Sequence, residues 1–267
     1  MGSSPPPPAE RAPLLAALLA LALSAGPACG LPPLAPGGPP FRPGETLAYD
    51  LDVMGMVKAG TLSLAVELPI ARGTLLPLRA RVRNTSVFAK ARRVKGYALS
   101  WVDAGTLRPQ RYRDEVEEDG VHKSTDARLD RPGPIALEWR LGDKHGTTTA
   151  PRRSEVMDLL STVYYLRAVR LEPGLALCFD LVANRRVWRL TGTVAAGREK
   201  VESPAGTFDT VRVDAVLVRA DGTGPKREVH FWFSRDARRL PVAAVSEIDL
   251  GPVRAMLARV GEPPPEP

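Results

Sequence analysis

Apolar and polar residues alternate with a period of two along most of the chain after residue 42. The segments 47–53 and 135–141 are clear examples, with apolar members Leu47, Tyr49, Leu51, Val53, Ile135, Leu137, Trp139 and Leu141. Because successive side chains of a strand point to opposite faces, this pattern predicts strands with one buried face. Turn-forming residues at 103–106, 117–120 and 221–224 separate several of these runs. The alternation predicts on the order of twelve antiparallel strands joined mainly by short turns.

One segment, residues 154–170, departs from this alternation. Its apolar residues recur at helical spacing and are Val156, Met157, Leu159, Leu160, Val163, Tyr164, Leu166 and Val169. Ser154 or Asp158 is suited to cap its start, and Pro173 and Gly174 end it. We predict one substantial helix near residues 155–168 as a plug or lid on the sheet. Since sheets of this size curl, the expected fold class is all-β, a single strongly curved antiparallel sheet or partly open β-barrel.

The first 30 residues have the features of a signal peptide. Arg11 precedes an apolar run at 13–23, which is shorter than the ~20 residues of a membrane-spanning helix, and small residues follow it. Two maturation routes remain open. Cleavage after Gly30, with Ala28 three residues from the cut, would give a periplasmic protein. Lipidation of Cys29 would give a lipoprotein anchored to the outer membrane, although Gly26 stands where a bacterial lipobox usually has Leu.

The remaining chain divides into three parts. Residues 31–42 are rich in Pro and Gly and predict an extended tether, and residues 261–267 predict a disordered tail. Residues 43–260 predict one β domain. If Cys29 is lost with the leader, Cys178 has no internal disulfide partner, and its apolar strand favours a small buried side chain.

The chain has a formal net charge of +7, and the one acid and one base of the leader cancel. Basic residues are spread along the strands, with the densest cluster at Lys90, Arg92, Arg93 and Lys95. This cluster either contacts anionic lipid headgroups or is a solvated turn between strands, and we favour the turn. Export argues against nucleic acid as a partner.

Candidate catalytic chemistry is sparse. The three histidines, His122, His145 and His230, have no metal-ligand spacing, and the sequence contains no Gly-x-Ser-x-Gly elbow. Two acid pairs share a strand face at i and i+2, namely Asp50 with Asp52 and Glu115 with Glu117. A solvated strand face explains them more simply than acid–base catalysis does. We therefore predict no catalytic residue, no metal ligand and no cofactor.

Several segments together resemble a known family. The clearest are PGETLAYD at 43–50, DLLSTVYYLR at 158–167, SPAGTFD at 203–209 and FWFSRDARRLPV at 231–242. In this order they resemble the bacterial exported proteins of the DUF3108 family, a domain of unknown function, over residues 43–258. The resemblance implies an envelope protein with a strongly curved antiparallel sheet. It brings no accepted catalytic residues.

Three hypotheses for function follow. The first is a non-enzymatic envelope protein that binds an apolar or amphipathic ligand, such as a lipid or lipid-linked glycan, in the hollow of the sheet. Its candidate lining residues are Tyr164, Tyr165, Trp101 and Trp139, for which packing is the alternative explanation. The second is a structural or assembly factor that docks an envelope partner by its sheet edge. The third is a hydrolase with an unrecognised site. An apolar cavity under the helix would favour the first hypothesis, and a filled core with an exposed edge strand the second.

Overall fold

The computed structural model describes Gly2 and residues 29–53, 55, 57–90, 92–248 and 251–261. In this part of the chain there are sixteen strands, one α-helix and two short 3₁₀ helices. The all-β fold class is confirmed, but the expected number of strands was too low. One strand that was missed, at 144–150, is polar on both faces, and another, at 156–158, lies in the segment assigned to the helix. Neither shows the alternation of a half-buried strand.

The elements before the helix are β1 (Thr46–Val53), β2 (Val57–Val66), η1 (Ala71–Gly73), β3 (Leu75–Asn84), η2 (Phe88–Lys90), β4 (Val94–Asp103), β5 (Pro109–Glu118), β6 (Val121–Arg128), β7 (Ile135–Leu141), β8 (Lys144–Ala150) and β9 (Val156–Asp158). The helix is α1 (Leu159–Ala168). The elements after it are β10 (Ala176–Ala183), β11 (Arg186–Val194), β12 (Glu199–Ser203), β13 (Gly206–Arg219), β14 (Arg227–Ser234), β15 (Pro241–Ile248) and β16 (Gly251–Gly261).

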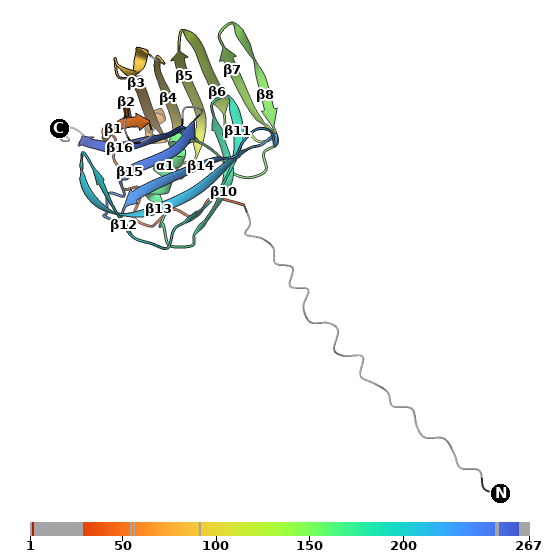
Figure 1. Cartoon of the computed structure of the whole chain (residues 1–267). Coiled ribbons are helices and arrows are strands. Elements are labelled where there is room, and N and C mark those ends of the chain that lie inside the picture. Colours follow the sequence, from red (N-terminus) through yellow and green to blue (C-terminus); the bar gives the residue numbers. More distant parts are fainter. Residues whose placement is uncertain are drawn as a thin grey trace.

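All sixteen strands belong to one sheet that curls around α1 (Figure 1). The strand order is β8-β7-β6-β5-β4-β3-β2-β1-β16-β15-β14-β13-β11-β10-β9, and β12 pairs with β13. Neighbouring strands are antiparallel except β9 and β10, which are parallel. The main apolar core lies inside the curl, around α1. A second, smaller core packs β5, β6 and β7 against β9, β10 and β11. We call β5 to β8 the flap, because this part of the sheet lies over β9, β10 and β11.

The helix begins at Leu159, four residues after the predicted position near residue 155. Val156 to Asp158 are extended and pair with β10, and the carboxylate of Asp158 then caps α1. Its Oδ1 atom accepts hydrogen bonds from the backbone N–H groups of Leu160 (2.9 Å) and Ser161 (2.8 Å). A side-chain acceptor at this position satisfies N–H groups that have no partner within the helix. One of the two predicted caps is therefore correct, and Leu159, expected in the buried stripe, is 45% exposed.

The carboxylate of Asp158 also connects the helix to the curled sheet. The hydroxyl group of Ser100 on β4 donates to Oδ2 of Asp158 at 2.6 Å, joining β4 to the start of α1. Asp158 is completely buried. Removal from water raises its pKa to about 6, although the hydrogen bonds from Ser100, Ser161 and Leu160 act in the opposite direction.

Residues 29–42 pack on the barrel and are not the free tether that we predicted. The backbone N–H of Ala35 donates to the carbonyl of Ala168 at 2.8 Å, and the Tyr165 hydroxyl donates to the carbonyl of Pro32 at 2.7 Å. Phe41 is buried edge-on against the ring of Tyr164. We call residues 29–42 the strap. A few apolar side chains among its Pro and Gly residues are enough to hold it over α1. The predicted tail at 261–267 lies outside the described residues except for Gly261, which ends β16, and most of the predicted signal peptide also lies outside them.

Candidate functional site

The space inside the curl is occupied by side chains of α1, the strap and the sheet. Arg167 is completely buried and forms a two-pronged ion pair with Glu45, with nitrogen–oxygen distances of 2.5 and 3.0 Å. Its guanidinium group also lies 5.0 Å from the ring centre of Phe41 and 5.4 Å from that of Tyr164. A buried charge with this many partners is structural, because its charge and its N–H groups are already satisfied.

The four candidate ligand-lining residues do not form one site. Tyr164 and Tyr165 lie in the core, where they are 1% and 5% exposed. Trp101 lies on β4, where its ring stacks with the guanidinium of Arg111 at 5.5 Å. Trp139 lies on β7, and its indole N–H donates to the hydroxyl of Thr148 at 3.0 Å. The two tyrosines and two tryptophans thus have separate packing roles, and a ligand for any of them stays a prediction.

A second buried polar group lies beneath the flap and was not anticipated. The Tyr112 hydroxyl donates to Asp114 at 2.9 Å, and the Thr125 hydroxyl accepts from the backbone N–H of Arg185 at 3.0 Å. Burial raises the pKa of Asp114 and raises that of Tyr112 well above its ordinary value. Tyr112 and Asp114 stand at i and i+2 on β5, so a carboxylate sharing a strand face with a tyrosine was the available signal. The hydrogen bond between Arg185 and Thr125 fastens the flap to the β10–β11 turn.

The histidines lie apart from each other. His122 borders a groove of about 620 Å³, His145 is exposed on β8, and His230 lies on β14 with its Nδ1 atom 2.6 Å from Asp214. The pair formed by His230 and Asp214 is about one-third exposed and belongs to a row of polar contacts that includes Arg212. Among the described residues, no group of three or more His, Cys, Asp or Glu side chains is placed to hold a metal ion.

The two acid pairs from the sequence are matched by basic side chains on neighbouring positions. Their ion pairs are Asp50 with Lys58, Asp52 with Arg254, Glu115 with Arg113, and Glu117 with Lys95. The first pair borders a groove of about 410 Å³ and the second pair borders the groove beside His122. Each acid lies next to a cation rather than next to another acid, so neither pair has the geometry of two carboxylates working together.

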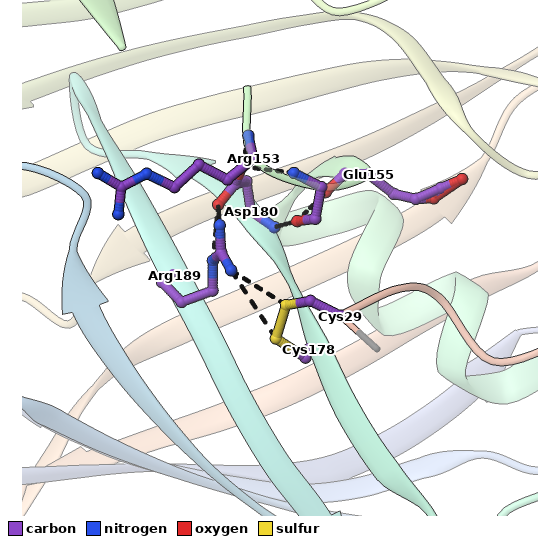
Figure 2. The surroundings of a disulfide bond; sticks show 7 residues. Cys29, Arg153, Glu155, Cys178, Asp180 and Arg189 are labelled. Atoms are coloured by element: carbon purple, nitrogen blue, oxygen red, sulfur yellow. Dashed lines mark hydrogen bonds and ion pairs between the residues drawn. A yellow bond between two sulfur atoms is a disulfide. The ribbon is translucent and has the colours of Figure 1, made fainter. Parts of the chain in front are cut away.

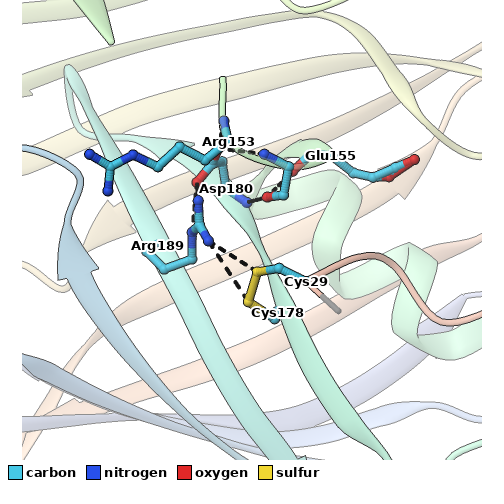
Figure 3. A network of polar contacts seen from close by, with 7 residues as sticks. Cys29, Arg153, Glu155, Cys178, Asp180 and Arg189 are labelled. Carbon is cyan, nitrogen blue, oxygen red and sulfur yellow. Dashed lines mark hydrogen bonds and ion pairs between the residues drawn. A yellow bond between two sulfur atoms is a disulfide. The ribbon is translucent and has the colours of Figure 1, made fainter. Parts of the chain in front are cut away.

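Cys29 and Cys178 form a disulfide that ties the strap to β10 (Figure 2). The two residues are 149 positions apart, so sequence spacing could not predict this contact, and it gives Cys178 the internal partner that Cys178 lacks if Cys29 is lost with the leader. The guanidinium of Arg189 lies beside the disulfide, with Nη1 3.0 Å from Sγ of Cys29. Arg189 is held by Asp180, whose other oxygen accepts from the backbone N–H groups of residues 153 and 154 (Figure 3).

One end of strands β1 to β8 carries exposed apolar side chains at four alternate strand connections. They are Val57, Val87, Val121 and Leu141, with exposures of 48, 71, 41 and 37%. These connections join β1 to β2, β3 to β4, β5 to β6 and β7 to β8. In an antiparallel meander, alternate connections lie at the same end of the strands. We call residues 57–58, 85–90, 92–95, 117–123 and 140–144 the hairpin rim. The tips of its last two hairpins are side by side in Figure 1.

Hydrogen bonds link the parts of the hairpin rim to each other. The hydroxyl of Thr85 donates to the carbonyl of Lys58 at 3.1 Å, the N–H of Asp119 to the carbonyl of Arg93 at 2.9 Å, and the N–H of Gly142 to the carbonyl of His122 at 2.7 Å. Each hairpin of the rim is therefore tied to its neighbour by at least one hydrogen bond.

The hairpin rim is more basic than acidic. Its basic residues are Lys58, Lys90, Arg92, Arg93, Lys95, Lys123, Arg140 and Lys144. Its acidic residues are Glu117, Glu118, Asp119 and Asp143. Lys90 and Arg93 are exposed next to Val87 and form no ion pair in the part of the chain that the structure describes. The cluster at 90–95, for which we favoured a solvated turn, lies in this apolar and basic surface.

These features define a β-barrel-like protein built from one curled sheet around a central helix. The chain belongs to DUF3108, a family of proteins of unknown function, whose model matches residues 48–258. This confirms the family that the sequence resembled. A β-barrel-like protein of the domain of unknown function DUF1849 from Brucella abortus has 13% sequence identity and a TM-score of 0.52. The match covers 81% of this chain and 96% of that chain, and it shows a shared fold.

Two other solved structures are more distant. A protein from Bacteroides fragilis described as exported, with a YmcC-like fold, has 13% identity and a TM-score of 0.35, with 84% of this chain and 99% of that chain covered. A protein from Parabacteroides distasonis described as a lipoprotein has 9% identity and a TM-score of 0.34, with the same coverage. No curated protein matches the chain. Within the described residues, none of the helices has the length and apolar character needed to span a membrane.

Proposed function

We propose that this is an exported, non-enzymatic protein that attaches to the anionic surface of an envelope membrane through its hairpin rim. The observation that carries this proposal is the set of exposed apolar side chains at one end of the strands, with the unpaired cations Lys90 and Arg93 beside Val87. An apolar side chain that is exposed in solution gains free energy when it enters the boundary between lipid headgroups and acyl chains. A basic side chain near an anionic membrane surface adds about 1 kcal/mol.

The proposal keeps the amphipathic partner of our first hypothesis but moves it from the hollow to the rim. Side chains fill the described interior, so a lipid would have to displace the ion pair of Arg167 and Glu45 to enter there. At the rim, in contrast, Val87 and Lys90 already face solvent. Export is supported by the signal-peptide pattern of the leader and by the disulfide, since disulfides persist in oxidising compartments.

The test is binding to vesicles of phosphatidylglycerol and phosphatidylcholine, measured by co-sedimentation, for the wild type and Val87→Asp. Placing a carboxylate at the most exposed apolar position of the rim removes apolar contact and adds repulsion. We expect affinity to fall by roughly tenfold or more, because burial of a Val side chain is worth about 1.5 kcal/mol or more. Vesicles of phosphatidylcholine alone should bind the wild type weakly.

Leu68→Asp is the matched control. Leu68 is as exposed as Val87, at 73%, but it follows the opposite end of β2, about 30 Å away along the strand. Its replacement should leave vesicle binding unchanged. Equal binding by wild type and Val87→Asp, or an equal loss in both variants, would rule out the rim as the membrane-binding surface.

A second candidate function is docking of an envelope protein, favoured by the free edge of β8. This strand pairs with β7 on one side and with no other described strand. Its residues are mostly exposed, and an extended peptide could add to such an edge by backbone hydrogen bonds. Thr147→Pro would block strand addition at the centre of β8. If docking is the function, this variant should lose its envelope complex on native gels while binding vesicles normally.

A further inference from the structure

We propose that Cys29 stays in the mature protein as half of a structural disulfide with Cys178, and that Arg189 promotes formation of this bond. The proposal concerns maturation and does not depend on membrane binding by the hairpin rim. It selects a third route beside the two that the sequence left open. Cleavage after Gly30 would remove the sulfur atom, and lipidation would occupy it with a thioether.

The position of Cys29 is prepared by the strap before any bond forms. Tyr165 binds the carbonyl of Pro32, and the N–H of Ala35 binds the carbonyl of Ala168, so the chain is held just three residues beyond Cys29. The Cα atoms of Cys29 and Cys178 are 4.8 Å apart, within the range that a disulfide requires. Holding two reacting groups in this way replaces a bimolecular encounter with an intramolecular step.

Small residues suited to signal-peptidase cleavage also occur before Cys29. Gly26 and Ala28 can supply the small side chains three residues and one residue before a cut at the Ala28–Cys29 bond. This cut would leave Cys29 as the new N-terminus. The disulfide therefore needs no departure from ordinary signal-peptide processing.

Arg189 is placed to stabilise a thiolate at this site. Its Nη1 atom lies 3.0 Å from Sγ of Cys29 and 3.9 Å from Sγ of Cys178. The guanidinium cannot easily turn away, because Asp180 binds it at 2.8 Å and is itself almost completely buried (Figure 2). Thiolates are the reactive form in disulfide exchange, and a neighbouring arginine favours them.

The disulfide between Cys29 and Cys178 forms in two thiol–disulfide exchange steps, with an oxidising protein disulfide as the second reactant. The thiolate of Cys29 attacks one sulfur of the oxidant and breaks its disulfide, which releases the other sulfur as a thiolate. The thiolate of Cys178 then attacks the mixed disulfide at Cys29, and the oxidant leaves as a dithiol that holds the two electrons. The two thiol protons pass to the solvent and the released thiolates.

The first experiment is mass spectrometry of the full chain purified from the envelope of its exporting host without reductant. We expect a peptide that contains Cys29 linked to the peptide that contains Cys178. A diacylglyceryl group on Cys29, or a mature chain that begins at Leu31, would overturn the proposal.

The second experiment measures how fast the bond closes. The purified exported protein is reduced in its folded state, glutathione disulfide is added, and remaining thiols are trapped over time by alkylation. Near neutral pH, Arg189→Gln should close roughly threefold or more slowly than the wild type, and the difference should vanish in alkaline solution, where thiols ionise without help. Arg189→Lys, which keeps the charge, should recover part of the rate.

Arg186→Gln is the matched control, because Arg186 is exposed on the same strand, β11. It should close at the wild-type rate. If Arg189→Gln closes as fast as Arg186→Gln near neutral pH, the role of Arg189 is excluded. If it is slower by the same factor at every pH, Arg189 acts on the structure and not on the thiolate, which also contradicts the proposal.

Discussion

Tyr164 and Tyr165 are adjacent on α1, but their hydroxyl groups have different surroundings. The Tyr165 hydroxyl donates to the carbonyl of Pro32 in the strap. The Tyr164 hydroxyl is buried and has no hydrogen-bond partner among the described residues. Burial raises the pKa of both phenols, so both stay protonated donors over the ordinary pH range. The Tyr165 hydroxyl therefore donates a hydrogen bond, whereas the Tyr164 hydroxyl donates none to a described residue.

This difference predicts opposite results for the same substitution. Tyr165→Phe should lower the free energy of unfolding by about 1 kcal/mol or more, because it leaves the buried carbonyl of Pro32 unpaired. Tyr164→Phe should leave the free energy of unfolding unchanged or raise it, since it removes an unsatisfied polar group. Urea unfolding of both variants beside the wild type measures the two effects. A larger loss for Tyr164→Phe would mean that its hydroxyl has a bound partner, as our ligand-lining prediction requires.

At the scale of the element, α1 depends on one carboxylate for both its start and its attachment. Asp158 caps the helix with one oxygen and accepts from Ser100 of β4 with the other. An uncharged Asn could keep most of these contacts. The charge itself is costly in this position, because the buried carboxylate has lost its hydration.

Asp158→Asn should therefore change how stability depends on pH. The pKa of Asp158 is about 6 in the folded protein, compared with 3.8 as its ordinary value. Since the folded state holds the proton more tightly, this group lowers the stability of the wild type as pH rises from about 4 to about 6. At 1.36 kcal/mol per pKa unit the full effect is about 3 kcal/mol.

The measurement is urea unfolding of the wild type and Asp158→Asn at several pH values. The difference between their free energies of unfolding isolates this group from the other carboxylates, which both proteins share. Relative to the variant, the wild type should lose stability between pH 4 and 7 and stay constant above that. A constant difference over this range would show that Asp158 has no raised pKa.

At the scale of the whole molecule, the alternation of apolar residues was sufficient to predict the fold class. It was not sufficient to predict contacts between distant segments. The disulfide joins residues 149 positions apart, and the flap is fastened by Thr125 and the turn at Arg185, which lie in different parts of the sequence. β8 was missed because an edge strand with two solvated faces has no apolar period. The strap was predicted to be a free tether because it is rich in Pro and Gly. Composition alone does not show that a few of its residues, such as Phe41, pack against the helix.

The candidate site was partly visible in the sequence for a similar reason. The basic cluster at 90–95 stands out locally, so it was identified, although its role remained open. Val121 and Leu141 looked like ordinary members of their strands, and Val57 looked like part of a hairpin connection. Only the order of strands in the sheet brings their hairpins to one end of the strands and leaves their side chains exposed. A surface made by topology cannot be recognised from any single segment.

The net charge of +7 and the basic excess of the hairpin rim lead to a prediction for the intact protein. Binding to anionic vesicles should weaken as salt is added, because the screening length falls from ~30 Å at 0.01 M to ~8 Å at 0.15 M ionic strength. A residual, salt-insensitive part should remain from the apolar side chains.

Neutralising the two unpaired cations together, with Lys90→Gln and Arg93→Gln, should cost about 2 kcal/mol of binding, or roughly thirtyfold in affinity, at low salt. The double variant should also depend less on salt than the wild type. Replacing Arg79 and Arg128, which lie on strands away from the rim, by Gln controls for the loss of two positive charges in general. If that control loses as much affinity as the rim variant, the protein binds by its overall charge and the hairpin rim has no special role.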